Sequence, residues 1–177
     1  TAPRAPAVEK AVPVYLALDG DTFTLGGGTL TVLQAGEQPQ NEGDAIDANN
    51  LSLCLRYTAG SFAFVDTGDA EADLEEQLVS RYGAGLQADL LKAGHHGSNT
   101  SNTQAFLDAV SPQAVVASCG LDNDYGHPHA EVVERVLAAG ADFYRTDQDG
   151  AVTAVYDQNG LQIHCTADDS GALAPAA

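Results

Sequence analysis

Three apolar, strand-like segments in the middle of the chain are each followed by a side chain that can bind a cation. The segments span 61–69, 88–94 and 113–120. The side chains that end or follow them belong to Asp69, His95, His96 and His127. Helical patterns separate the segments, and such sheets gather their ligands at the carboxyl ends of the strands. The sequence therefore predicts an α/β fold with a mixed sheet and a site at one edge of it.

The segments on either side predict further strands. Alternating residues at 21–25 and 29–33 flank three glycines at 26–28, which predicts a β-hairpin. An apolar stretch at 51–57 predicts the strand that precedes 61–69. Near the end we expect a β-meander of the segments 142–146, 151–157 and 161–165, with hairpin turns at Asp149-Gly150 and Asn159-Gly160.

Apolar residues at helical spacing predict three helices, at about 70–82, 103–110 and 129–139. We expect a linker at residues 1–11, which are rich in Ala and Pro, one domain at 12–166 and a disordered tail at 167–177. The chain starts at Thr1 and contains no Met, so we expect a processed product or an excised domain.

The composition is that of a globular but strongly acidic chain. Apolar residues make up 44% of it, and no apolar run reaches the roughly 18 residues that span a bilayer, so we expect a soluble chain. With 25 Asp and Glu against 7 Lys and Arg, it lacks the cationic surface that tight, non-specific nucleic-acid binding needs. Bound divalent cations would supply positive charge locally. Cys54 and Cys119 lie in apolar segments, where buried thiols are expected.

The carboxylate and the imidazoles at the strand ends match the ligands of a borderline divalent metal such as Zn²⁺ or Mn²⁺. Such a metal lowers the pKa of a bound water to about 7 and so supplies hydroxide at neutral pH. Glycines flank Asp69, His95, His96 and His127, which lets the backbone turn sharply there. Together these features favour a metal site.

Each of these residues also has a structural interpretation. Asp69 alone is more typical of a helix N-cap, and an N-cap could also bind metal. The paired histidines could form a solvated turn, and His127 could pack on Tyr125. His129 is expected to start a helix, and His164 to be structural.

Three short motifs, TGDAE, GHHGS and YGHPH, follow one another along the chain. With the sequence around them, over about Val12 to Gln158, they resemble the metallo-β-lactamase-fold hydrolase domain of ComEC-type competence proteins. The resemblance implies a four-layered αββα sandwich with a dinuclear metal centre between its halves. It covers the C-terminal half of that fold.

The resemblance also implies roles for particular residues. Asp69 would be the metal-bridging carboxylate, and either His95 or His96 a metal ligand. His127 would face the cleft, to hold a phosphate or protonate a leaving group. Two residues in matched motifs would orient the substrate, Ser98 and Asn50.

One family feature is absent from the chain. The family's first metal motif, HxHxDH or HxDxDH, precedes the matched region, and this chain has no His before His95. We therefore expect an incomplete metal site whose remaining ligands come from an N-terminal half that was removed, is supplied by another chain, or was lost. Half a sandwich would also expose an apolar sheet face, which predicts a homodimer through that face.

The expected function is a metal-dependent phosphodiesterase or nuclease of a DNA-uptake protein, using Zn²⁺ or Mn²⁺. Its substrate would be DNA or another phosphodiester. It would lie on the extracytoplasmic face of a bacterial membrane protein, or be secreted or periplasmic, with any membrane attachment through segments outside this chain. The alternative is a non-catalytic binding or scaffold domain that keeps the fold without the metal.

Overall fold

The structure is a computed structural model, which describes residues 15–36 and 47–167. The expected linker at 1–11 and the tail from 168 onward lie outside the described residues.

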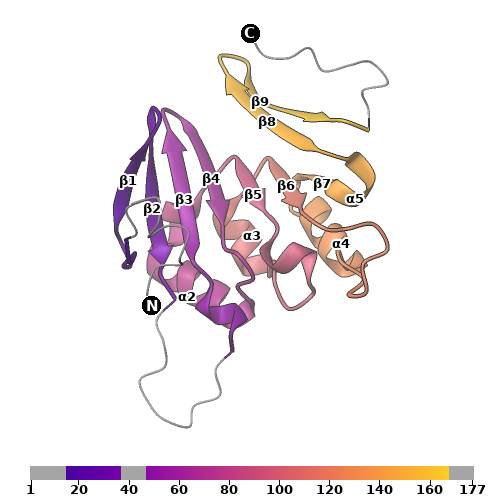
Figure 1. Cartoon of the computed structure of the whole chain (residues 1–177), viewed down its shortest axis with the longest axis horizontal. Coiled ribbons are helices and arrows are strands. Elements are labelled where there is room, and N and C mark those ends of the chain that lie inside the picture. The colour runs from indigo at the N-terminus through magenta and orange to yellow at the C-terminus, as the bar shows by residue number, and fades with distance from the viewer. Residues whose placement is uncertain (1–14, 37–46, 168–177) are drawn as a thin grey trace, which may run out of the picture.

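Seven strands form one sheet, in the same order as in the sequence (Figure 1). They are β1 (Thr22–Leu25), β2 (Gly28–Gln34), β3 (Cys54–Ala59), β4 (Phe62–Asp66), β5 (Leu90–Lys92), β6 (Ala114–Ala117) and β7 (Asp142–Arg145). The first four pair antiparallel and the last four parallel, so β4 takes part in both halves. The expected α/β fold with a mixed sheet is confirmed, as is the hairpin of β1 and β2.

Three helices cover one face of this sheet: α2 (Ala72–Tyr82), α3 (Gln104–Val110) and α4 (Ala130–Ala138) (Figure 1). The core between the two layers is apolar, because alternate strand residues meet the inward stripe of each helix. Its fully buried members include Val65, Leu91, Val115, Leu74, Phe106 and Val132. Three of the four parallel strands, β4, β5 and β6, thus have their carboxyl ends fixed side by side.

A second, two-stranded sheet lies against the opposite face. It consists of β8 (Val152–Asp157) and β9 (Gly160–Cys165). The ring of Tyr156 lies 5.1 Å from that of Phe62, and the Tyr156 hydroxyl is 2.9 Å from Ser61 Oγ. The described residues therefore stack as helices, large sheet and small sheet, which is the α–β–β part of an αββα order. Association of two copies through the uncovered part of this face stays a prediction.

The expected closing meander is wrong. Strand β7 pairs parallel with β6, where Val116 lies opposite Tyr144, and does not pair with β8. A short helix, α5 (Thr146–Asp149), follows β7 and replaces the expected hairpin turn at Asp149-Gly150. The carboxylate of Asp149 accepts a hydrogen bond from the backbone N–H of Arg145 and so stabilises this helical turn. The final hairpin does form, with its turn one residue earlier than expected, between Asp157 and Gly160.

Two element boundaries also differ from expectation. Residues 49–51 form a helical turn, so β3 begins at Cys54 rather than at Leu51. Helix α2 begins at Ala72 after Glu71, so Asp69 is not its N-cap.

The two cysteines expected to be buried differ in their surroundings. Cys54 is fully buried on β3, and this burial raises the pKa of its thiol to about 12. Cys119 is only half-buried, and its thiol lies 3.2 Å from the carboxylate of Asp147 as a hydrogen-bond donor.

Candidate functional site

The carboxyl ends of β4, β5 and β6 bring Asp69, His95, His96 and His127 together. Nε2 of His96 lies 3.5 Å from Oδ1 of Asp69. The ring centroid of His127 is 5.5 Å from that of His95 and 6.4 Å from that of His96. Groups from three separate strand ends thus share one small region, as the order of elements predicts.

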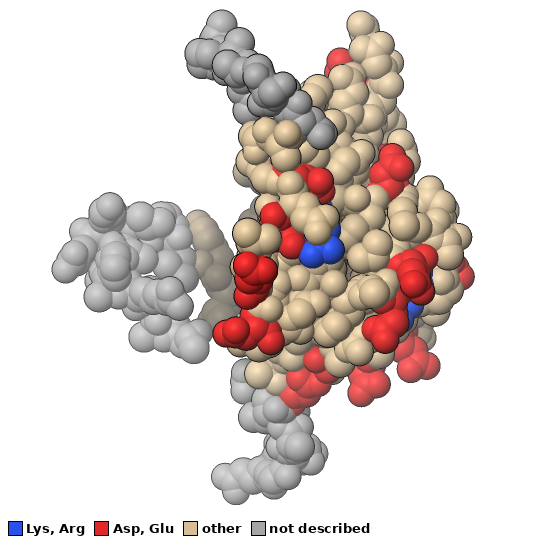
Figure 2. Space-filling model, turned by 90° about the vertical axis from the view of Figure 1, so that its right-hand side faces the viewer, with Lys and Arg blue, Asp and Glu red and all other residues tan. Residues whose placement is uncertain are grey.

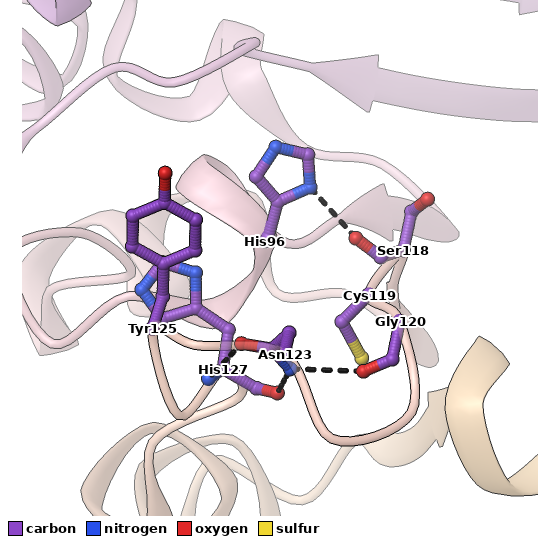
Figure 3. Close-up of a pocket in the computed structure, with 7 residues that line it drawn as sticks. All are labelled: His96, Ser118, Cys119, Gly120, Asn123, Tyr125 and His127. Carbon is purple, nitrogen blue, oxygen red and sulfur yellow. Dashed lines mark hydrogen bonds between the residues drawn. The ribbon is translucent and has the colours of Figure 1, made fainter.

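Asp69 and His96 form the first carboxylate–imidazole pair. Nδ1 of His96 lies 2.7 Å from the carbonyl oxygen of Ser118 (Figure 3). A carbonyl can only accept, so Nδ1 carries the hydrogen, and in the neutral ring Nε2 presents its lone pair towards Asp69. Metal-binding histidines are commonly anchored in this way through the other ring nitrogen. Two ligands at about 2.0–2.2 Å from one Zn²⁺ fit a separation of 3.5 Å between the two atoms.

His95 and Glu71 form a second pair next to the first. Nδ1 of His95 lies 3.4 Å from Oε1 of Glu71, and it is buried without a hydrogen-bond partner. The same Glu71 oxygen accepts hydrogen bonds from Asn49 Nδ2 and Thr100 Oγ1, both at 3.0 Å. Glu71 lies two positions after Asp69 in the TGDAE motif, but an acidic residue at the start of a predicted helix does not by itself indicate a site role.

The two paired histidines hold an uncommon backbone conformation. His95 has φ 47° and ψ 46°, and His96 has φ 57° and ψ 19°. Consecutive left-handed residues other than glycine are unfavourable, and such strain persists only where the surroundings enforce it. The backbone N–H of His95 donates to the carbonyl of Gly68, which ties this turn to the Asp69 loop.

A buried polar network enforces the turn. The amide side chain of Asn102 accepts from the N–H of Gly94 at 2.8 Å and donates to its carbonyl at 3.0 Å. Asn102 is itself held by the carboxylate of Glu75, which accepts from the backbone N–H groups of Asn102 and Thr103 at 2.6 and 2.7 Å. Arg135 on α4 donates to the carbonyl of Asn102. Residues of α2 and α4 therefore fix the residue that precedes His95.

The loop after β6 brings His127 against this turn. His129 donates from its backbone N–H to the carbonyl of Gly97 at 2.9 Å, and a Cβ at Gly97 would lie 2.6 Å from the Cβ of Pro128. Glycine is therefore needed for the close approach of the two loops. Asn123 stabilises this loop, because its side chain accepts a hydrogen bond from the N–H of His127 and donates one to the carbonyl of His127.

The imidazoles at this edge affect one another. His127 is 9% exposed, and burial lowers its pKa below the ordinary value of 6.5, with His129, His95 and His96 lowering it further. His129 precedes α4, as expected for a helix-start residue, and its Nδ1 accepts a hydrogen bond from the N–H of Asn99.

Comparisons with known proteins extend these observations. No protein-family model matches the chain. It is 45% identical over 117 residues to Competence protein ComA of Neisseria gonorrhoeae, a match that covers 66% of this chain and 17% of the relative. It is 34% identical over 150 residues to ComE operon protein 3 of Bacillus subtilis, covering 85% of this chain and 19% of the relative. The chain belongs to the ComEC family of competence proteins.

Other matches agree with this assignment. Recombination protein 2 of Haemophilus influenzae is 32% identical over 115 residues, covering 65% of this chain and 14% of the relative. This ComEC-family chain thus spans less than a fifth of the length of these relatives. Among solved structures, the CmlA β-hydroxylase E377D mutant aligns with a TM-score of 0.43 and 11% identity over 72% of this chain and 31% of its own, too loosely to bear on function.

Two further predicted residues of the ComEC-family chain hold the loops of the site. Asn50 accepts from the N–H of Glu71 and donates to Asp47. Ser98 is 4% exposed, and its hydroxyl lies 3.0 Å from that of Thr100. Both lie near the carboxylate–imidazole pairs, and both use their polar atoms on neighbouring loops.

The donor set of the ComEC-family chain is partial. Within residues 15–36 and 47–167, no group of three or more His, Cys, Asp or Glu side chains is arranged to hold a metal ion. The Asp69–His96 pair fits two ligands of one borderline ion. A complete coordination sphere would need further ligands.

Charge on this ComEC-family chain is unevenly distributed. On the side of the molecule that carries α4 and α5, Asp and Glu are spread over the surface, and Lys and Arg contribute only small areas (Figure 2). In the described part of the chain, no helix combines the length and the apolar character needed to cross a membrane.

Proposed function

We propose that the chain is part of a metal-dependent hydrolase that cleaves phosphodiesters, with DNA as the substrate in a DNA-uptake process. The observation that carries the proposal is the Asp69–His96 pair, whose imidazole is anchored through Nδ1 so that Nε2 and a carboxylate oxygen stand 3.5 Å apart. The name of one matched relative, Competence protein ComA, supports the link to DNA uptake.

In the proposed enzyme Asp69 and His96 hold Zn²⁺ or Mn²⁺, with His95 and Glu71 beside them. The remaining ligands would come from the N-terminal half of the domain that the sequence resemblance implies. A bound metal would supply an activated water at neutral pH. His127 holds the phosphate or donates a proton to the leaving oxygen, since it lies between the paired histidines and His129 at ring distances of 5.0–6.4 Å. Asn50 and Ser98 orient the loops against which the substrate lies.

We further propose that the activity lies on the outer side of a bacterial membrane, as the resemblance to ComEC-type proteins implies. The chain carries net charge −18, so substrate binding would rely on the metal and on the four clustered imidazoles rather than on Lys and Arg. We therefore expect the activity to depend steeply on added divalent metal.

Two measurements test the proposal. Titration of the chain with Zn²⁺ should show binding that Asp69→Ala and His96→Ala each weaken at least tenfold, while Asp73→Ala on the exposed side of α2 leaves it unchanged. With the full-length protein, Mn²⁺ and single-stranded DNA, cleavage should be lost in Asp69→Ala. Cleavage that survives Asp69→Ala would exclude the assignment, and a full-length protein without bound metal would support a scaffold role instead.

A further inference from the structure

A cavity of about 300 Å³ lies directly beside the Asp69–His96 pair. The rings of His96, Tyr125 and His127 lie to one side of it, and residues 118–120 lie to the other (Figure 3). His96 thus belongs both to the cavity wall and to the proposed metal pair. A cavity of this size lies at the small end of the range for ligand sites, which suits one ring system rather than an extended ligand.

No Asp, Glu, Lys or Arg lines the cavity, although the chain carries a net charge of −18. Several of its polar atoms are also already bonded within the protein. Nδ2 of Asn123 donates to the carbonyls of Gly120 and His127, and the thiol of Cys119 donates to Asp147. The walls therefore offer stacking surface, together with the ring nitrogens of the two histidines and the hydroxyl groups of Ser118 and Tyr125.

Tyr125 provides the stacking surface. Its side chain is 77% exposed, although an aromatic ring of this size is usually at least partly buried. The ring lies 5.6 Å from that of His127 with an interplanar angle of 24°, which leaves the rest of its surface to the cavity and the solvent. Exposed aromatic rings of this kind are the platforms on which bases of single-stranded nucleic acids stack, with little dependence on sequence.

We propose that this cavity takes one base of a single-stranded nucleic acid, which stacks on Tyr125 while the adjoining phosphate lies at the histidines. The inference rests on the proposed function for the position of the phosphate. It adds that the substrate is unpaired, because a base within a duplex could not enter the cavity. It also adds that all four bases are accepted, because stacking on an aromatic ring depends little on which base is present.

Binding of single nucleotides tests this directly, without metal or turnover. The chain is titrated with the four deoxynucleoside monophosphates and, as the base-free probe, with 2-deoxyribose 5-phosphate, and NMR resonances of the histidine rings report binding. All four nucleotides should bind with similar affinity and more tightly than the sugar phosphate. Tyr125→Ala should weaken nucleotide binding by about 5- to 150-fold and leave the sugar phosphate unaffected.

Two variants serve as controls. Tyr125→Phe keeps the ring and should bind nucleotides as the unchanged chain does. Leu121→Ala removes a side chain on the same loop that is 72% exposed and lies outside the cavity, so it should also have no effect.

The outcomes separate this inference from the proposed hydrolase. Any of three results would overturn the stacking inference. Tyr125→Ala could weaken the binding of the sugar phosphate as much as that of the nucleotides, it could leave nucleotide binding unchanged, or the chain could strongly prefer one base. Base binding without any DNA cleavage by the full-length protein would contradict only the hydrolase proposal.

Discussion

Two of the three loops that form the candidate site are each held by one asparagine that bonds to the backbone. Asn102 holds the turn of His95 and His96 from within the core and is fully buried. Asn123 holds the loop of His127 at the surface, where Tyr125 is exposed. Asn102 enforces a strained backbone, as the proposed metal ligand would require. Asn123 leaves the ring of Tyr125 accessible, as the proposed contact with a base would require.

The largest expected difference between the two loops is in stability. Asn102→Ala leaves the buried N–H and carbonyl of Gly94 without partners and should lower the free energy of unfolding by about 2–4 kcal/mol. Asn123→Ala lets water replace most of its bonds and should cost about 0.5–1.5 kcal/mol. Urea denaturation of both variants measures the two values. Equal losses would mean that the loops do not differ in this way.

Glu75 should make the stability of the buried loop depend on pH. Burial raises the pKa of Glu75 above the ordinary value of 4.5, although backbone hydrogen bonds from Thr103 and Asn102 oppose the shift. The folded state then binds more protons than the unfolded state above pH 4.5, so stability falls as the pH rises through the raised pKa. Glu75→Gln should remove this fall, which amounts to at most about 1.4 kcal/mol per pH unit. Denaturation midpoints measured across this pH range test it; a slope retained in the variant would assign it to other groups.

One substitution at a position of positive φ in each loop should change the stability of the protein in opposite directions. His95→Gly should stabilise the protein by about 0.5–1 kcal/mol, because glycine adopts positive φ freely and the unpartnered Nδ1 is removed. In the other loop Gly126 has φ 71°, so Gly126→Ala should destabilise the protein by about 1 kcal/mol. Melting temperatures of the two variants should therefore move in opposite directions. A lower melting temperature for His95→Gly would show that the turn is not strained.

The smallest effect on stability is expected for Tyr125, which lines the cavity. Tyr125→Ala should change the free energy of unfolding by less than about 0.5 kcal/mol, because its side chain is largely exposed. A larger loss by thermal denaturation would indicate that Tyr125 supports the loop rather than the ligand.

The sequence predicts the strand ends well, because each apolar segment is short and is followed by a glycine-flanked polar residue. That pattern is sufficient to bring Asp69, His96 and His127 to one edge of the sheet. The supporting residues are harder to predict. Glu75 looks like an ordinary acidic residue of an amphipathic helix, and Asn102 like part of a polar loop, until tertiary packing buries both.

The end of the chain shows a second limit. Segment 142–146 has the same alternating pattern whether it pairs with β6 or with β8, and the choice depends on α4, which carries the chain back across the sheet. The Asp149-Gly150 pair is typical of a hairpin turn, yet the carboxylate of Asp149 closes a helical turn instead.

Because Cys54 is buried, chemical modification of its thiol can report how often the sheet opens around it. The thiolate is the form of cysteine that attacks alkylating reagents. Because the pKa of Cys54 is about 12, the native state contains almost no thiolate at neutral pH. Modification of Cys54 should therefore occur only in molecules whose third strand has separated from its neighbours. The rate at which an unlabelled sample takes up the reagent at this position then measures how often the sheet comes apart.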